Sequence, residues 1–224
     1  MKLRISEINE AEYTNVVLLT TIVLSLFCST SFAQKKLSTR EILDKTAQVM
    51  KQDGGIKAKF VTTLFQSTTP KDEVSGDIKL LGEKYVMSTE SMSTWFDGSK
   101  QWNLIYENRE VTVTTPTPEE LQASSPTLFI DLYQEGFKLS HKNASLRGRE
   151  VWEVTLKPEN RKQEPSVIVI SIDKQNYYPL CLRIRNNGDW TRISISDFTP
   201  SAGLNKNDFS YPAQEYPQYE VIEY

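Results

Sequence analysis

Residues 94–120 read TWFDGSKQWNLIYENREVTVTTPTPEE, and they carry the clearest strand pattern of the chain. They place two tryptophans and a tyrosine, Trp95, Trp102 and Tyr106, on short segments that are separated by the turn-forming dipeptides DG and EN. Because side chains alternate along a strand, Trp102, Leu104 and Tyr106 share one face of the segment 101–106. Such large apolar side chains need either a core or a ligand to cover them.

The same two-residue period extends on both sides of this stretch. The turn signal Asn187-Gly188 predicts a type I′ hairpin. Connections this short favour antiparallel strands over parallel βαβ units, so the predicted fold class is mainly β. Strands are predicted at residues 56–64, 77–81, 84–88, 92–96, 101–106, 137–141, 151–156, 167–172, 180–185 and 191–198.

A helix is predicted to start at Ser38, because Ser38 and Glu41 have the spacing of a capping box. The double glycine Gly54-Gly55 is its expected end. One face of this helix is apolar, which predicts that it covers the sheet. That face carries Ile42, Leu43, Ala47 and Met50.

Two further short helices are predicted between residues 116 and 136. Thr117 is the expected cap of the first and Pro118 its first-turn residue. Pro126 opens the second, which carries an apolar stripe that must face either the sheet or a ligand. The stripe consists of Leu128, Phe129, Leu132 and Tyr133.

The first 33 residues are predicted to be an export signal. The apolar run 16–27 is too short to span a bilayer of about 30 Å, and small residues lead to a cleavage site after Ala33. Two alternatives stay open: a start site downstream of Met1, and lipid attachment at Cys28, for which the bulky Phe27 is a poor fit. Residues 34–224 are then a single domain whose one thiol, Cys181, is expected in the core and has no disulfide partner.

Composition argues against several classes of function. The chain has 26 Lys and Arg against 29 Asp and Glu, a net charge of −3. It therefore lacks the strongly basic charge that is typical of nucleic-acid-binding proteins. Its one histidine, His141, is expected at the surface, so nothing supports a catalytic triad, and one His with one Cys is too few ligands for a zinc site. We expect no enzyme activity, metal or cofactor, because no pair among the candidate carboxylates stands out as a catalytic set. The candidates are Asp72-Glu73, Glu119-Glu120 and Glu215.

Together, these motifs resemble the periplasmic outer-membrane lipoprotein carrier family, the LolA-like proteins, in the version found in Bacteroidetes-type bacteria. The resemblance covers the whole exported chain in order. It rests on the run Trp95-Phe96-Asp97-Gly98 followed by Trp102, Tyr106 and Glu110-Val111, and on PTPEEL (residues 116–121) and SPTLFIDLYQEGF (residues 125–137).

The resemblance implies an incomplete antiparallel β-barrel, or half-barrel, with a lid of short α-helices. It also implies a periplasmic carrier that takes the acyl chains of lipoproteins released from the inner membrane by an ABC transporter. The carrier, a monomer, delivers them to an outer-membrane acceptor or to the outer membrane itself. The expected acyl-chain-binding residues are Phe60, Leu64, Leu80, Tyr85, Trp95, Trp102, Leu104, Tyr106, Phe129 and Leu132.

One departure from the family concerns the lid. Better-known members carry an arginine on the third strand that ties the lid shut, whereas this chain has Gly82 at about that position. Another latch, or none, is therefore expected here.

Two other functions compete with that of a carrier. A periplasmic sensor of lipid or lipoprotein that regulates an envelope-stress response is the alternative, since one such regulator shares the half-barrel. That regulator has a second domain, for which residues 34–224 leave no room. An enzyme acting on glycans or lipids would need two carboxylates converging in a cleft.

Overall fold

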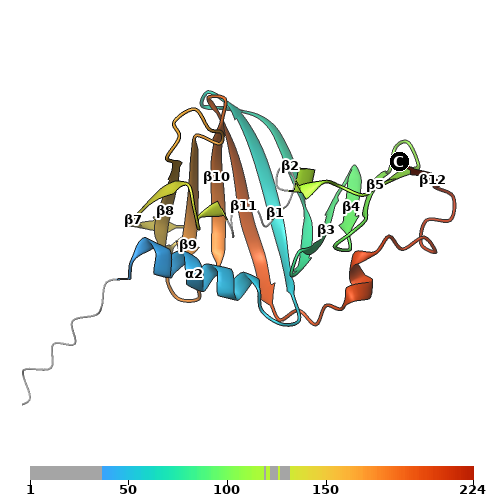
Figure 1. Cartoon of the computed structure of the whole chain (residues 1–224), viewed down its shortest axis with the longest axis horizontal. Helices are drawn as coiled ribbons and strands as arrows, with labels where there is room; N and C mark the ends of the chain where they lie inside the picture. The colour runs from blue at the N-terminus through green and yellow to red at the C-terminus, as the bar shows by residue number, and fades with distance from the viewer. Residues whose placement is uncertain (1–36, 119, 122–125, 127–131) are drawn as a thin grey trace, which may run out of the picture. The chain divides into compact units, whose positions relative to one another are not determined.

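Alternating apolar and polar residues form the strands of one open sheet in the computed structural model of the chain, which describes residues 37–118, 120–121, 126 and 132–224. Across this sheet the strands follow the order β12-β6-β5-β4-β3-β2-β1-β11-β10-β9-β8-β7 (Figure 1). They are β1 (Ile56–Gln66), β2 (Thr69–Leu81), β3 (Lys84–Thr89), β4 (Met92–Phe96), β5 (Gln101–Ile105), β6 (Glu110–Thr114), β7 (Phe137–Leu146), β8 (Arg149–Pro158), β9 (Val167–Asp173), β10 (Pro179–Asn186), β11 (Asp189–Pro200) and β12 (Glu220–Glu223). Because β12 and β7 are edges that do not pair with each other, the sheet is an incomplete barrel, as predicted.

Two strands of this sheet were not predicted from the sequence. β6 is a five-residue strand between a turn and a proline-containing segment, and β12 is only four residues long. β12 runs parallel to β6, with Val221 opposite Val111, whereas the other neighbouring strands pair antiparallel. The pairing of β12 with β6 joins segments far apart in the chain and leaves no local signal. β6 also pairs with its neighbour β5, and the alternation of Val111 and Val113 with Thr112 is a local signal that the prediction did not use. The wholly antiparallel sheet that was expected is corrected at this edge.

The predicted first helix is α2 (Thr39–Met50), and it begins with the expected capping box between Ser38 and Glu41. It ends at Met50, a few residues before the predicted glycines. Gly55 has a φ of +70°, and a Cβ at that position would lie 2.4 Å from the carbonyl oxygen of Leu80, so only glycine fits. α2 crosses the β7–β11 part of the sheet (Figure 1).

A long C-terminal segment, residues 201–219, connects β11 to β12 and lies along β3 (Figure 1). It contains the short 3-10 helix η1 (Lys206–Phe209), which Asn205 and Asp208 cap reciprocally. The sequence prediction assigned no structure to this segment.

The structure confirms one predicted turn and one predicted helix start. The turn between β10 and β11 has positive φ at both Asn187 (49°) and Gly188 (93°), as the predicted type I′ turn requires. Thr117 caps a helical turn: its hydroxyl accepts from the Glu120 backbone N–H, and its own N–H donates to the Glu120 carboxylate. The export signal and most of the second lid helix, including Leu128 and Phe129, lie outside the described residues.

The described residues include no helix that is long and apolar enough to cross a membrane. By the contacts between its residues, Ser38–Tyr224 forms one unit.

Candidate functional site

The sheet has two apolar faces, and each is covered by a different segment. Cross-strand pairing places Val154, Ile170 and Leu182 side by side on one face, because directly opposed residues of antiparallel strands point the same way. We call this the helix face, since α2 lies on it. The opposite face carries Val86, Trp95 and Leu104 on β3, β4 and β5. We call it the tail face, since residues 204–219 pack there.

α2 buries its apolar residues against the helix face. Ile42 is 0% exposed and Leu43 3%. At the start of the helix, Thr39 Oγ1 lies 2.8 Å from Nδ1 of His141 on β7. The surface position predicted for His141 is therefore corrected: the ring is half-buried and faces α2, because His141 lies directly opposite Val154 on the helix face.

The described residues leave part of the helix face accessible. Phe60 on β1, Ile78 on β2 and Met87 on β3 are half-buried. Further along the β1–β2 hairpin, Leu64 is 45% exposed and Val74 is 42% exposed. An apolar surface that continues from a buried core into solvent is a feature of ligand-binding and interaction sites.

Four of the residues predicted to bind acyl chains lie on this face. Leu80 stands opposite both Ile56 and Tyr85, and Phe60 and Leu64 follow Ile56 at even spacing along β1. Leu80 and Tyr85 are buried, 4% and 2% exposed, whereas Phe60 and Leu64 remain accessible. Accessible contact area on this face is thus concentrated toward the β1–β2 turn.

Four others, Trp95, Trp102, Leu104 and Tyr106, lie on the tail face. The strand pairing places them there. Trp95 is opposite Val86 and Trp102, so all three share one face. Val86 directly follows the helix-face residue Tyr85 on β3, so this face is the opposite one. The expectation that all these residues line a single trough is corrected on this point, because the turn between β3 and β4 fixes a register that pairs Trp95 with Val86 rather than with Tyr85. Of the remaining two, Leu132 is half-buried and Phe129 lies outside the described residues.

The tail face is filled by the chain's own C-terminal segment. Phe209 is 0% exposed and Leu204 9%, and both belong to one core cluster with Val86, Trp95 and Leu104. The rings of Tyr211 and Tyr216 meet the Trp95 ring edge-on at 5.6 and 6.2 Å. Trp95 is therefore buried by the chain's own C-terminal segment, and Trp102 and Tyr106 are partly buried against the same cluster.

Burial also changes the acidity of this aromatic cluster. The pKa of Tyr216 is raised from 10.0 to about 12, first because burial disfavours the phenolate and then because its hydroxyl is hydrogen-bonded to Tyr106. Burial likewise raises the pKa of Tyr211, whose hydroxyl has no hydrogen-bond partner among the described residues. Both phenols are therefore neutral at physiological pH.

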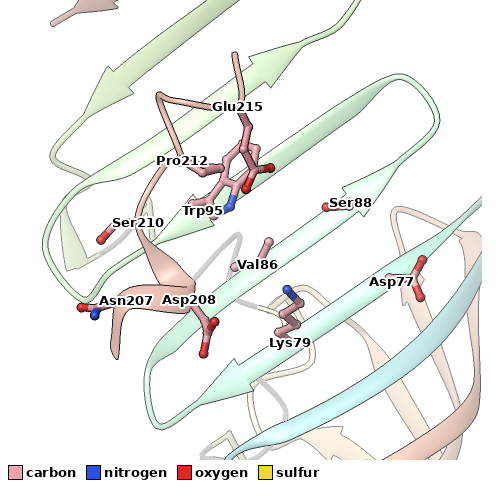
Figure 2. Close-up of a pocket in the computed structure, with 10 residues that line it drawn as sticks. All are labelled: Asp77, Lys79, Val86, Ser88, Trp95, Asn207, Asp208, Ser210, Pro212 and Glu215. Atoms are coloured by element: carbon pink, nitrogen blue, oxygen red, sulfur yellow. The ribbon is translucent and has the colours of Figure 1, made fainter. Parts of the chain in front are cut away.

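A cavity of about 270 Å³ lies between the C-terminal segment and strands β2–β4. Figure 2 shows Pro212 and Glu215 of the segment beside Trp95, with Lys79 reaching up from β2. Its walls mix cationic, anionic and hydroxyl side chains, so it is a polar cavity rather than an acyl-chain site. The other residues lining it are Asp77, Val86, Ser88, Asn207, Asp208 and Ser210.

The carboxylates considered as catalytic candidates have local roles. Glu120 accepts hydrogen bonds from Thr117, and these lower the pKa of its carboxyl. Glu73 accepts from the Thr63 hydroxyl at 3.0 Å, and Glu215 lines the tail-face cavity. No group of three or more His, Cys, Asp or Glu in the described part of the chain could hold a metal ion.

Cys181 is 6% exposed on β10, as expected for a core thiol. Burial is the main cause of its raised pKa, so the side chain stays a protonated, weakly nucleophilic thiol at neutral pH.

The segment after the second lid helix is tied to α2. The Tyr133 hydroxyl donates to Asp44 Oδ1 at 2.7 Å, and the Arg40 guanidinium donates to the Gln134 carbonyl at 3.2 Å. Gly82, expected at about the position of the family's lid arginine, sits in the β2–β3 turn with a φ of +61°. In this chain, contacts with α2 hold this end of the segment.

Comparisons with known proteins agree with the fold. An uncharacterized conserved protein from Thermus thermophilus superposes with a TM-score of 0.56 at 13% identity, over 84% of this chain and 100% of that chain. A putative outer membrane lipoprotein-sorting protein domain from Vibrio parahaemolyticus gives 0.42 at 14% identity, over 77% and 97%. The Pseudomonas aeruginosa MucA/MucB complex gives 0.45 at 14% identity, over 79% and 62%. Of these three structures, only the first has a TM-score above 0.5. Because its sequence identity is 13%, this similarity concerns the fold alone.

A search of curated proteins gave no match. The profile of the family described as outer membrane lipoprotein carrier protein LolA matches residues 29–188, most of the chain. The chain therefore belongs to the LolA family of outer membrane lipoprotein carrier proteins.

Proposed function

We propose that the protein is a periplasmic carrier that binds lipoprotein acyl chains on the uncovered part of the helix face. The observation that carries this proposal is the accessible apolar strip on the β1–β2 hairpin, where Leu64 is 45% exposed and Val74 is 42% exposed. This strip continues the buried core beneath α2, in a chain of a family described as lipoprotein carriers. The four predicted residues on the tail face are not part of the proposed site.

Carrying such a ligand requires a limited affinity. Burying one fourteen-carbon acyl chain, with ~13 methylenes at ~0.8 kcal/mol each, is worth roughly 10 kcal/mol. Several chains held at that full strength would not be released. A partly covered face weakens binding, because the ligand displaces side chains that already contact the sheet and only the difference appears as net affinity.

The remaining parts of the proposal follow from the family. The leader would be cleaved after Ala33 on export to the periplasm. Cargo would come from an inner-membrane ABC transporter that releases lipoproteins, and would pass to an outer-membrane acceptor or the membrane itself. The carrier would act as a monomer and without a cofactor.

The direct test is to purify the protein from the periplasm of its own host and identify bound molecules by mass spectrometry. Acylated lipoproteins are the expected cargo. Failure to recover any of them after blocking delivery to the outer membrane would contradict the proposal. Recovery of a membrane anti-sigma factor in their place would support the sensor function.

A pair of variants tests the location of the site. Leu64→Asn with Val74→Asn removes apolar contacts from two accessible positions, and we expect binding of an acylated lipopeptide to weaken roughly tenfold. Val221→Asn is the matched control, because Val221 is also apolar and 53% exposed but lies on the edge strand β12. Equal affinity of both variants for the lipopeptide would place the site elsewhere.

A further inference from the structure

A second cavity, of about 310 Å³, lies where β1, β10 and β11 approach their turns. Its lining includes two guanidinium groups, Arg183 and Arg192, and two aromatic rings, Phe65 and Trp190. Arg192 pairs with Arg183 across the strands, and Trp190 pairs with Phe65, so these four side chains share the tail face. Hydroxyl residues complete the lining: Ser67, Thr68 and Thr191. Of the described residues that line this cavity, none carries a carboxylate, although the chain as a whole has a net charge of −3.

Arg192 is held in place by a chain of hydrogen bonds. Its guanidinium donates to Thr63 Oγ1 at 3.1 Å, and the Thr63 hydroxyl in turn donates to Glu73 Oε2 at 3.0 Å. Glu73 thereby orients the hydroxyl so that its lone pairs accept from Arg192. Thr63 is only 2% exposed, so the hydroxyl that accepts from Arg192 is itself buried, whereas Arg192 reaches the surface. The guanidinium also lies 5.2 Å from the centre of the Phe65 ring.

Arg183 is positioned in a similar way. One of its nitrogens donates to Glu153 Oε2 at 3.0 Å, and Glu153 also contacts Lys142 at 2.8 Å. A guanidinium carries five N–H donors, so Arg183 and Arg192 each keep donors that these contacts do not use. Two preoriented guanidinium groups side by side match the oxygens of a phosphate, which arginine binds through paired hydrogen bonds.

We propose that this cavity binds a phosphate group, with Arg183 and Arg192 as its direct ligands. The hydroxyls of Ser67 and Thr68 add hydrogen-bond donors. The rings of Phe65 and Trp190 form an apolar wall against which the rest of the phosphate-bearing ligand can pack. A phospholipid headgroup and a free phosphate compound share this chemistry. The site does not depend on acyl-chain binding at the helix face, because it stands on the opposite face of the sheet.

The test uses the purified protein and two probes. Calorimetric titration with inorganic phosphate measures binding of the free anion. Flotation with phosphatidylcholine vesicles, with and without about 30% phosphatidylglycerol, measures binding to a lipid headgroup. The double variant Arg183→Gln/Arg192→Gln removes both ligands, and we expect at least a tenfold loss of affinity for whichever probe binds.

A matched control is available on the neighbouring strand β1. Lys57 and Lys59 point to the tail face at the end of β1 that lies away from the cavity, and Lys57→Gln/Lys59→Gln removes the same amount of charge. We expect less than a twofold effect of this variant. Arg192→Lys keeps the charge but loses the planar pair of donors, so a severalfold loss is expected even if the double variant folds poorly.

The outcomes separate the two sources of phosphate. Binding to phosphatidylglycerol vesicles alone assigns a lipid headgroup, and binding to inorganic phosphate alone assigns a soluble compound. The proposal is overturned if the intact protein binds neither probe. It is also overturned if the Lys57/Lys59 variant loses as much affinity as the arginine variant.

Discussion

The helix face and the tail face are both apolar, but they are covered to different degrees. On the tail face Trp95 is 6% exposed, and both Leu104 and Phe209 are 0% exposed beneath the chain's own C-terminal segment. On the helix face the apolar surface runs out from under α2 to Leu64 and Val74, which stay 45% and 42% exposed. Large apolar residues on a strand therefore do not by themselves mark a ligand site. The segment that covers them decides whether they form a core or a binding surface.

The largest effect is expected where the C-terminal segment enters the tail face. Phe209→Ala removes a ring that is 0% exposed, so we expect a loss of about 3–5 kcal/mol in the free energy of unfolding, measured by urea denaturation. The loss combines the transfer of the ring to water with the cavity it leaves.

Val221→Ala serves as the control for this measurement, because Val221 lies near the end of the chain and is 53% exposed. A cost for Phe209→Ala as small as that of Val221→Ala would mean that the C-terminal segment is only loosely attached. The distinction between the two faces would then fail.

The next effect concerns the contact that holds the lid segment to α2. Tyr133→Phe removes a hydroxyl that donates to the Asp44 carboxylate at 2.7 Å, and hydrogen bonds to charged groups contribute about 1.5–3 kcal/mol. We expect a loss of about 2 kcal/mol in the free energy of unfolding, with faster hydrogen exchange at residues 132–135. Unchanged exchange there would show that other contacts hold the segment.

Much of the fold could be predicted from local sequence. The capping box at Ser38 and the Asn187-Gly188 turn need only neighbouring residues, and the structure confirms both. The alternation of Trp102 and Leu104 against Asn103 was also visible, and the cross-strand pairs confirm it.

The face on which each strand presents its residues could not be predicted in this way. A one-residue difference in register exchanges the two faces of a strand, and for Trp95 the β3–β4 turn fixes that register. Nothing near Trp95 in sequence shows that Tyr211 and Tyr216 will cover it. A signal did exist in the C-terminal segment: Phe209, Tyr211, Tyr216 and Tyr219 are concentrated in a short run that carries no strand period.

A smaller effect is expected from pH. The pKa of Tyr216 is about 12 in the folded protein, against 10.0 as the ordinary value. The folded state therefore keeps this proton at a pH where the unfolded state has lost it. The stability that this difference contributes is complete below pH 10 and is lost as the pH rises toward 12.

Urea denaturation at pH 9 and pH 11 measures this loss, and Tyr216→Phe should reduce it. Tyr211 contributes in the same direction, because burial also raises its pKa, so the variant should not abolish the fall. A fall of the same size in Tyr216→Phe would show that Tyr216 titrates normally and that the aromatic cluster is open to water.

The smallest change in stability is expected on the uncovered part of the helix face. Leu64→Asn and Val74→Asn alter side chains that are 45% and 42% exposed, and substitutions at such positions usually change stability by about 0.5 kcal/mol or less. Apolar side chains this exposed offer contact area that the fold itself does not use, which is what the proposed site requires. If these two substitutions each cost as much as Tyr133→Phe, Leu64 and Val74 would belong to the protein's own core, and the helix face would differ from the tail face only in how tightly it is packed.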